Sequence, residues 1–71
     1  MDYISNLKRI RKEKGYTQTE IAEHLGVPQT QIVRYEQGIN ELPIRYLIQL
    51  CYLYKVSSDT ILNIDIQNFT D

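Results

Sequence analysis

The 71-residue sequence predicts an all-α domain, because three of its features agree. Apolar residues recur at three- and four-residue steps in nearly every segment, which is the spacing of one face of a helix. The three glycines each follow such a segment, where helices commonly end. Apolar residues make up 42% of the chain, which suits a compact core and argues against disorder. A chain of this length forms one domain.

Capping residues delimit the first two helices. The apolar pattern indicates a first helix over residues 3–14, which ends at Gly15. The second helix has the strongest start signal in the sequence. Thr17 and Glu20 match a T-x-x-E capping box, in which each side chain bonds the backbone N–H of the other residue. The apolar pattern then continues to Gly26, where we expect this helix to end.

Prolines begin the next two helices. The third helix is expected to start at Pro28 or Gln29, since proline suits the first helical position, and to end at Gly38. A fourth helix follows Pro43, and Ser57 can cap a short fifth one. The inner face of the fourth helix is expected to consist of Leu47, Leu50, Cys51 and Tyr54.

Two domain segments are therefore expected. Residues 1–62 form the helical domain, and residues 63–71 form a C-terminal tail whose alternating pattern indicates either a strand or a loose arm. No stretch is apolar enough to cross a membrane, and basic residues interrupt any signal-peptide pattern near the N-terminus. A single cysteine excludes an intramolecular disulfide and suits a reducing compartment. We therefore expect a cytoplasmic protein.

Enzymatic and metal-binding functions find little support in the sequence. One histidine and one cysteine are too few for a common zinc site, and no glycine-rich phosphate loop is present. His24 is interpreted as a surface residue. Cys51 is interpreted as a small buried apolar residue, since free cysteines are often buried. We expect no enzyme, no metal and no cofactor.

The second and third predicted helices are joined by a connection of about three residues, which is the spacing of a helix-turn-helix. Ala22 is small where the two helices must approach closely, and Gly26 permits the left-handed backbone that a sharp turn requires. Ile32 is placed to anchor the third helix to the core. The pattern by itself leaves an ordinary αα-hairpin as an equal alternative.

The residues of this segment carry a resemblance that favours the first interpretation. Residues 17–38 read TQTEIAEHLGVPQTQIVRYEQG and closely resemble the Cro/repressor-type helix-turn-helix family, also called the XRE family. The similarity extends over about residues 7–62. It implies a five-helix, lambda-repressor-like domain that binds specific sequences of double-stranded DNA. The implied function is transcriptional regulation of the bacterial or phage type, in the role of a repressor.

An alternative function within the same fold is a protein-interaction module or an antitoxin-like partner that lacks DNA affinity. The chain departs from the family at Pro28, where a side-chain cap is lost, and in the loop of residues 39–42, which is often basic in the family. Here that loop contains Glu41, which a phosphate would repel. The isoelectric point of 5.7 also favours the alternative slightly.

The resemblance implies a role for particular residues. The third helix of the family lies in the major groove, which assigns base reading to Gln29, Thr30, Gln31, Val33 and Arg34. Their chemistry suits this, because glutamine can bond adenine and arginine can bond guanine. Gln18 and Gln37 match phosphate-contact positions. Arg11 and Glu36 match an ion pair that orients the third helix and does not read DNA. The alternative for the polar residues of the third helix is a merely solvated surface.

We also expect a homodimer that binds a near-palindromic operator, because one such domain covers too short a site to be specific. Apolar residues near the C-terminus supply surface for a second copy, and the tail could serve as a dimer arm: Tyr52, Tyr54, Ile64, Ile66 and Phe69. The alternative is that these residues fold back on their own domain. The chain contains no recognisable sensor domain, so no small-molecule effector is implied.

Overall fold

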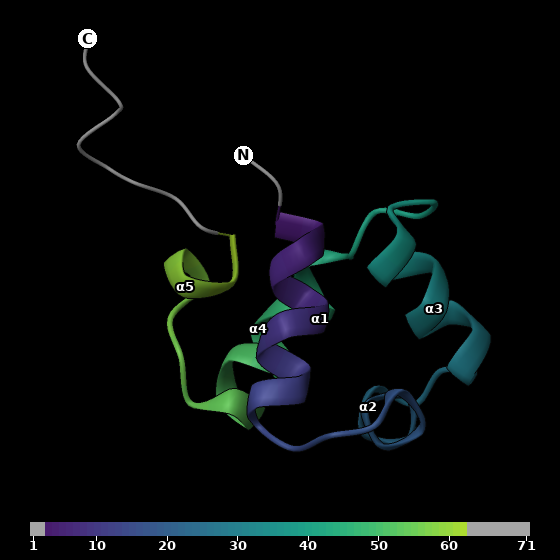
Figure 1. Ribbon diagram of the computed structural model, residues 1–71, viewed down its shortest axis with the longest axis horizontal. Helices are drawn as coiled ribbons and strands as arrows, with labels where there is room; N and C mark the ends of the chain where they lie inside the picture. The colour runs from purple at the N-terminus through teal and green to yellow at the C-terminus, as the bar shows by residue number, and fades with distance from the viewer. Residues whose placement is uncertain (1–2, 63–71) are drawn as a thin grey trace, which may run out of the picture.

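The computed structural model describes residues 3–62, and within that range every regular element is an α-helix. This confirms the predicted all-α fold (Figure 1). The predicted tail, residues 63–71, lies outside the described residues. The five helices are α1 (Tyr3–Glu13), α2 (Gln18–Leu25), α3 (Gln29–Gln37), α4 (Ile44–Tyr54) and α5 (Ser58–Leu62).

Helix α1 is the central element of the arrangement. It contacts α3 on one side and α5 on the other, while α2 packs on α3 and α4 packs on α5 (Figure 1). Every helix contributes to one core, so a single cluster of apolar side chains fixes all five relative to each other. Its buried members are Leu7, Ile10, Ile21, Ala22, Leu25, Ile32, Tyr35, Leu50, Tyr54 and Ile61.

The predicted capping box begins α2. The Glu20 N–H donates to Thr17 Oγ1 at 3.1 Å, and the Thr17 N–H donates to Glu20 Oε1 at 2.8 Å. These two bonds satisfy amides that a helix start would otherwise leave without a partner. The predicted cap of the last helix is also present, since Ser57 Oγ accepts the Thr60 N–H at 3.3 Å.

The prolines occupy a different position from the one the sequence suggested. Pro28 and Pro43 are the N-cap residues of α3 and α4, with extended backbone (φ −64°, ψ 149° at Pro28), rather than the first helical residues. The extended ψ angle directs the Pro28 carbonyl into the helix, where it accepts the Gln31 N–H at 2.9 Å. The first helix also ends one residue earlier than expected, at Glu13.

The two tyrosines of α4 have opposite environments. Tyr54 is buried, with 3% of its surface exposed, whereas Tyr52 is 80% exposed. The expectation that Tyr54 offers surface to a second copy is therefore wrong, because its ring fills the domain's own core. Cys51 packs partly buried against the core and His24 is exposed, in agreement with their interpretations. None of the helices within residues 3–62 is long and apolar enough to cross a membrane.

Candidate nucleic-acid interface

The turn between α2 and α3 is held by backbone hydrogen bonds. Gly26 adopts a left-handed conformation (φ 72°, ψ 33°), and the Val27 N–H donates to the Ala22 carbonyl at 3.0 Å. This is the Schellman arrangement that satisfies the last carbonyls of a helix. Ala22 and Ile32 are both 3% exposed, so the two helices meet through small and branched side chains in the core. The connection is thus short and fixed by contacts on both sides.

Helix α3 divides its residues between the core and the surface. Ile32 and Tyr35 are buried, which leaves the opposite face outward. Gln31 and Val33 are partly buried at the margin of that face. Four of the predicted contact residues are exposed: Gln29, Thr30, Arg34 and Gln37. The structure therefore brings the five predicted base-reading residues together on one short helix and places Gln37 at its C-terminal end.

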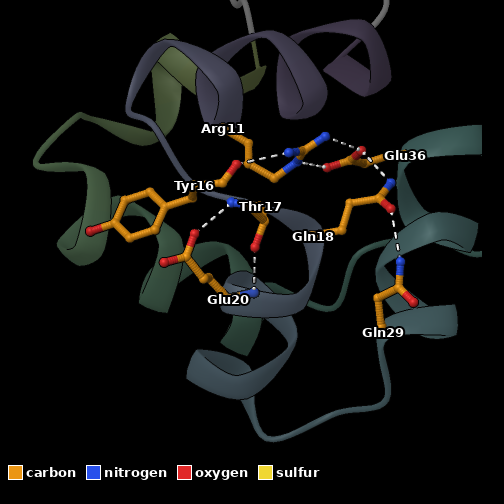
Figure 2. Close-up of polar contacts among 7 residues, drawn as sticks. All are labelled: Arg11, Tyr16, Thr17, Gln18, Glu20, Gln29 and Glu36. Carbon is orange, nitrogen blue, oxygen red and sulfur yellow. Dashed lines mark hydrogen bonds and ion pairs between the residues drawn. The ribbon is translucent and has the colours of Figure 1, made fainter.

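A nearly buried ion pair ties α3 to α1 (Figure 2). Arg11 Nε donates to Glu36 Oε2 at 2.7 Å, and Arg11 Nη2 donates to Glu36 Oε1 at 3.2 Å. The two side chains are only 8% and 7% exposed. Arg11 Nη1 also donates to the Tyr16 carbonyl at 2.8 Å, so the same guanidinium fixes the loop that precedes α2. A bidentate pair in such surroundings restricts the orientation of α3 on the core.

The polar contacts continue from Glu36 toward the exposed end of α3. Gln18 Nε2 donates to Glu36 Oε1 at 3.1 Å, and Gln29 Nε2 donates to Gln18 Oε1 at 3.0 Å. Figure 2 shows Gln18 lying between these two residues. The predicted phosphate contact, one predicted base reader and both members of the ion pair thus form one chain of hydrogen bonds. Gln37 does not belong to it.

The resemblance implied the pair of Arg11 and Glu36, but sequence reasoning missed the two contacts of Gln18 that extend it. These contacts join residues 11 and 18 positions apart, and no periodicity links such positions. The available signal was chemical: Gln18 and Gln29 open two successive helices, and both carry amides. Only the docking of α2 on α3 brings their side chains within hydrogen-bond distance.

Two tyrosines, Tyr16 and Tyr54, pack against each other near the ion pair. The rings of Tyr16 and Tyr54 have centroids 5.9 Å apart, tilted at 45°. Burial raises the pKa of the Tyr54 hydroxyl above its usual value of 10.0, and the nearby Arg11 charge offsets only part of that effect. Tyr54 therefore remains protonated and neutral beside the ion pair at ordinary pH.

Positive charge is sparse along the α2–α3 segment. Arg34 is the one lysine or arginine in residues 18–37, which also contain three glutamates. Four of the eight lysines and arginines are on α1, where Lys8, Arg9 and Lys12 are exposed. Any phosphate contact made by α2 and α3 therefore depends on polar side chains and on backbone amides at helix starts more than on net charge.

Comparison with known proteins places this geometry in a family. The Helix-turn-helix family model matches residues 7–61. The HTH-type transcriptional regulator ImmR of Bacillus subtilis (strain 168) is 37% identical over 65 residues, which are 92% of this chain and 51% of that protein. The chain thus spans about half the length of the curated relatives it matches.

Two solved structures are similar to the model. A transcriptional regulator from Listeria innocua superposes with a TM-score of 0.84 at 28% identity, over 99% of this chain and 65% of that one. SinR, the master regulator for biofilm formation, was solved in complex with DNA and superposes with a TM-score of 0.74 at 32% identity, over 86% of this chain and 98% of that one. The turn, the helix that follows it and the matched family model agree: this chain belongs to the XRE-type helix-turn-helix family.

Proposed function

We propose that the chain binds specific sites in double-stranded DNA through α3 and regulates transcription as a repressor, with residues 1–62 as the DNA-binding unit. The observation that carries the proposal is the outward face of α3, which a buried ion pair holds in place. A similar protein was solved in complex with DNA, and the relatives are transcriptional regulators. The chemistry of the exposed side chains is that of direct base reading.

Each side chain of this face has a role in the proposal. Arg34 donates two hydrogen bonds to guanine, and Val33 contacts a thymine methyl group. Gln29 bonds adenine, and Thr30 and Gln31 bond the neighbouring base edges. Gln18 begins α2 and Gln37 ends α3. Both bond phosphates and fix the position of the domain without reading sequence.

Selection of bound sequences from a random pool of duplex DNA tests this function. We expect one preferred site, and we expect affinity for it to fall as salt is raised. Arg34→Ala should lower affinity for that site by about 1–3 kcal/mol and relax the preference at one base pair. A folded Arg34→Ala variant with an unchanged preference would refute the assignment of Arg34, and a wild-type chain that selects nothing would refute the function.

We also propose that the protein binds as a homodimer to a near-palindromic site. Three exposed apolar residues follow one another at four-residue steps along α4, and they support pairing with a second copy: Ile44, Ile48 and Tyr52. Arg45 is the single charged residue of α4, so two copies of this helix meet without strong repulsion. Pairing places two α3 helices in successive major grooves about 34–36 Å apart. The tail of residues 63–71 would then act as an arm.

A protein-interaction module is the second candidate function. The exposed Glu41, the low isoelectric point of 5.7 and the sparse positive charge of α2 and α3 favour it. The same DNA selection separates the two candidates. A module without DNA affinity yields no preferred sequence and no salt-dependent shift in the presence of competing nonspecific DNA.

A further inference from the structure

The side-chain amide of glutamine can present either its oxygen or its NH2 group, and the contacts of this site decide which. The Glu36 carboxylate, bonded to Arg11, has oxygens that only accept hydrogen bonds. Gln18 must therefore turn its NH2 group toward Glu36, where the nitrogen lies 3.1 Å from Oε1. The Gln18 oxygen is left facing α3.

The orientation of the Gln18 amide in turn fixes that of Gln29. The Gln18 oxygen accepts from Gln29 Nε2 at 3.0 Å, so Gln29 must also commit one N–H to the protein. Its own oxygen and its second N–H remain for another partner. Each amide orientation follows from the one before it, and the series begins at the carboxylate of Glu36 (Figure 2).

We propose that Glu36 is a positioning residue that sets the base preference of Gln29 through Gln18, an inference that rests on the proposed reading of DNA by α3. A side chain with one outward oxygen and one outward N–H matches the N6 donor and N7 acceptor of adenine. It mismatches guanine, which presents two acceptors, N7 and O6. An unconstrained glutamine would turn its amide to suit either base, so the contact with Gln18 makes Gln29 selective.

This role of Gln18 is compatible with a phosphate contact. Its NH2 group has two hydrogens, of which Glu36 takes one. The two roles have different consequences, however. Loss of a phosphate contact weakens all DNA sites alike. Loss of the amide orientation changes the preference at one base pair only.

Base selection by four chains tests the proposal: wild type, Glu36→Gln, Gln18→Ala and the double variant. Gln29→Ala first identifies the base pair that Gln29 reads. Wild type should prefer adenine there over guanine on the order of ten-fold. In Glu36→Gln the new amide keeps an oxygen for Arg11 and turns its NH2 group toward Gln18. The amides of Gln18 and Gln29 then turn over, so that Gln29 presents its NH2 group to the DNA. The base preference should therefore move toward guanine or thymine, which present acceptors.

The double variant separates orientation from a general structural effect. Gln18→Ala should flatten the preference at this base pair, and Glu36→Gln should have no additional effect on it in that background. Gln37→Ala is the matched control, because it removes a proposed phosphate contact outside the chain of hydrogen bonds: it should weaken binding to all sites alike and leave every base preference intact. Circular dichroism establishes that each variant is folded.

Each result of this experiment is decisive. A folded Glu36→Gln variant that keeps the wild-type preference overturns the proposal. So does a change in base preference that Glu36→Gln causes equally in the wild-type and in the Gln18→Ala background. If Glu36→Gln does not fold, Gln18→Ala decides, and full retention of the adenine preference in that variant overturns the proposal. A wild-type chain that selects no sequence overturns the proposed function and this inference with it, whereas the preceding outcomes leave DNA binding intact.

Discussion

Glu36 accepts three hydrogen bonds from side chains of two other helices. Its carboxylate accepts from Arg11 on α1 and from Gln18 on α2, while the residue itself belongs to α3. One side chain therefore joins the three helices that form the candidate interface. The Glu36 side chain is nearly buried, which strengthens these hydrogen bonds. For the same reason, a partner left without its hydrogen bond lowers the stability of the folded domain.

Removal of Glu36 should therefore destabilise the domain without DNA. Glu36→Ala leaves the Arg11 guanidinium buried and without its carboxylate, a loss on the order of 3 kcal/mol. Thermal unfolding followed by circular dichroism should show that Tm falls by at least about 10 °C in a domain of this size. Glu13→Ala is the control, because its pair with Arg9 is more than half exposed and should contribute about 0.5 kcal/mol or less. Equal Tm values for both variants would contradict the structural role.

Tyr54 should make the stability of the protein fall at alkaline pH. Burial raises the pKa of its hydroxyl in the folded state, whereas the unfolded hydroxyl ionises near 10.0. Unfolding thus releases a proton above that pH, so stability present below about pH 10 is lost as the pH rises. Urea unfolding at pH 8 and at about pH 10.5 should show a smaller decline for Tyr54→Phe. Tyr52→Phe, at an exposed position, should decline like wild type, and identical slopes for all three would argue against the prediction.

Some helix ends of this domain can be recognised from the residue type in the sequence, and one cannot. Gly26 and Gly38 end α2 and α3 in the left-handed conformation, and glycine at such positions is a familiar signal. Helix α4 ends in the same way at Lys55, with φ 58° and ψ 46°. Both the Lys55 and the Val56 N–H bond the Cys51 carbonyl. The sequence carries no glycine here, so this helix end could not be recognised by residue type.

Replacement of Lys55 by glycine should stabilise the domain. A side chain with a Cβ atom costs about 1–2 kcal/mol in the left-handed conformation, and the greater freedom of glycine in the unfolded chain offsets part of the gain. We expect Lys55→Gly to raise the free energy of unfolding by about 0.5–1 kcal/mol, as measured by urea unfolding. Lys55→Ala removes the same charge but keeps the strain, so it should not match the gain. A glycine variant no more stable than the alanine variant would contradict this account.

At the scale of the whole molecule, the apolar stripe of Ile44, Ile48 and Tyr52 should govern assembly. Ile48 is the middle residue of the stripe and is half exposed, so Ile48→Glu would place a charge in the centre of the proposed contact between two copies. Sedimentation should show a wild-type dimer, in solution or on DNA, and a monomer for this variant. Gln49→Glu adds the same charge to an exposed neighbour outside the stripe and should leave the dimer intact. A wild-type monomer with and without selected DNA would end the proposal.

The sequence could specify much of the fold because the relevant interactions are local. The capping box of Thr17 and Glu20 and the cap at Ser57 each join residues three positions apart, and each is present in the structure. The apolar periodicity of α1, α2 and α3 likewise indicated the buried face of each helix. In α4 the same periodicity placed Tyr54 on the inner face, where the structure has it, and only the separate expectation that Tyr54 offers surface to a second copy is wrong.

The sequence alone was enough to predict the number of helices, most of their ends, the helix-turn-helix and the family. These depend on caps, turns and patterns that act within a few residues. The tertiary structure alone decided how Gln18, Gln29 and Glu36 meet. Their hydrogen bonds join different helices and require distances near 3 Å, which only the close packing of α1, α2 and α3 on a shared core can fix.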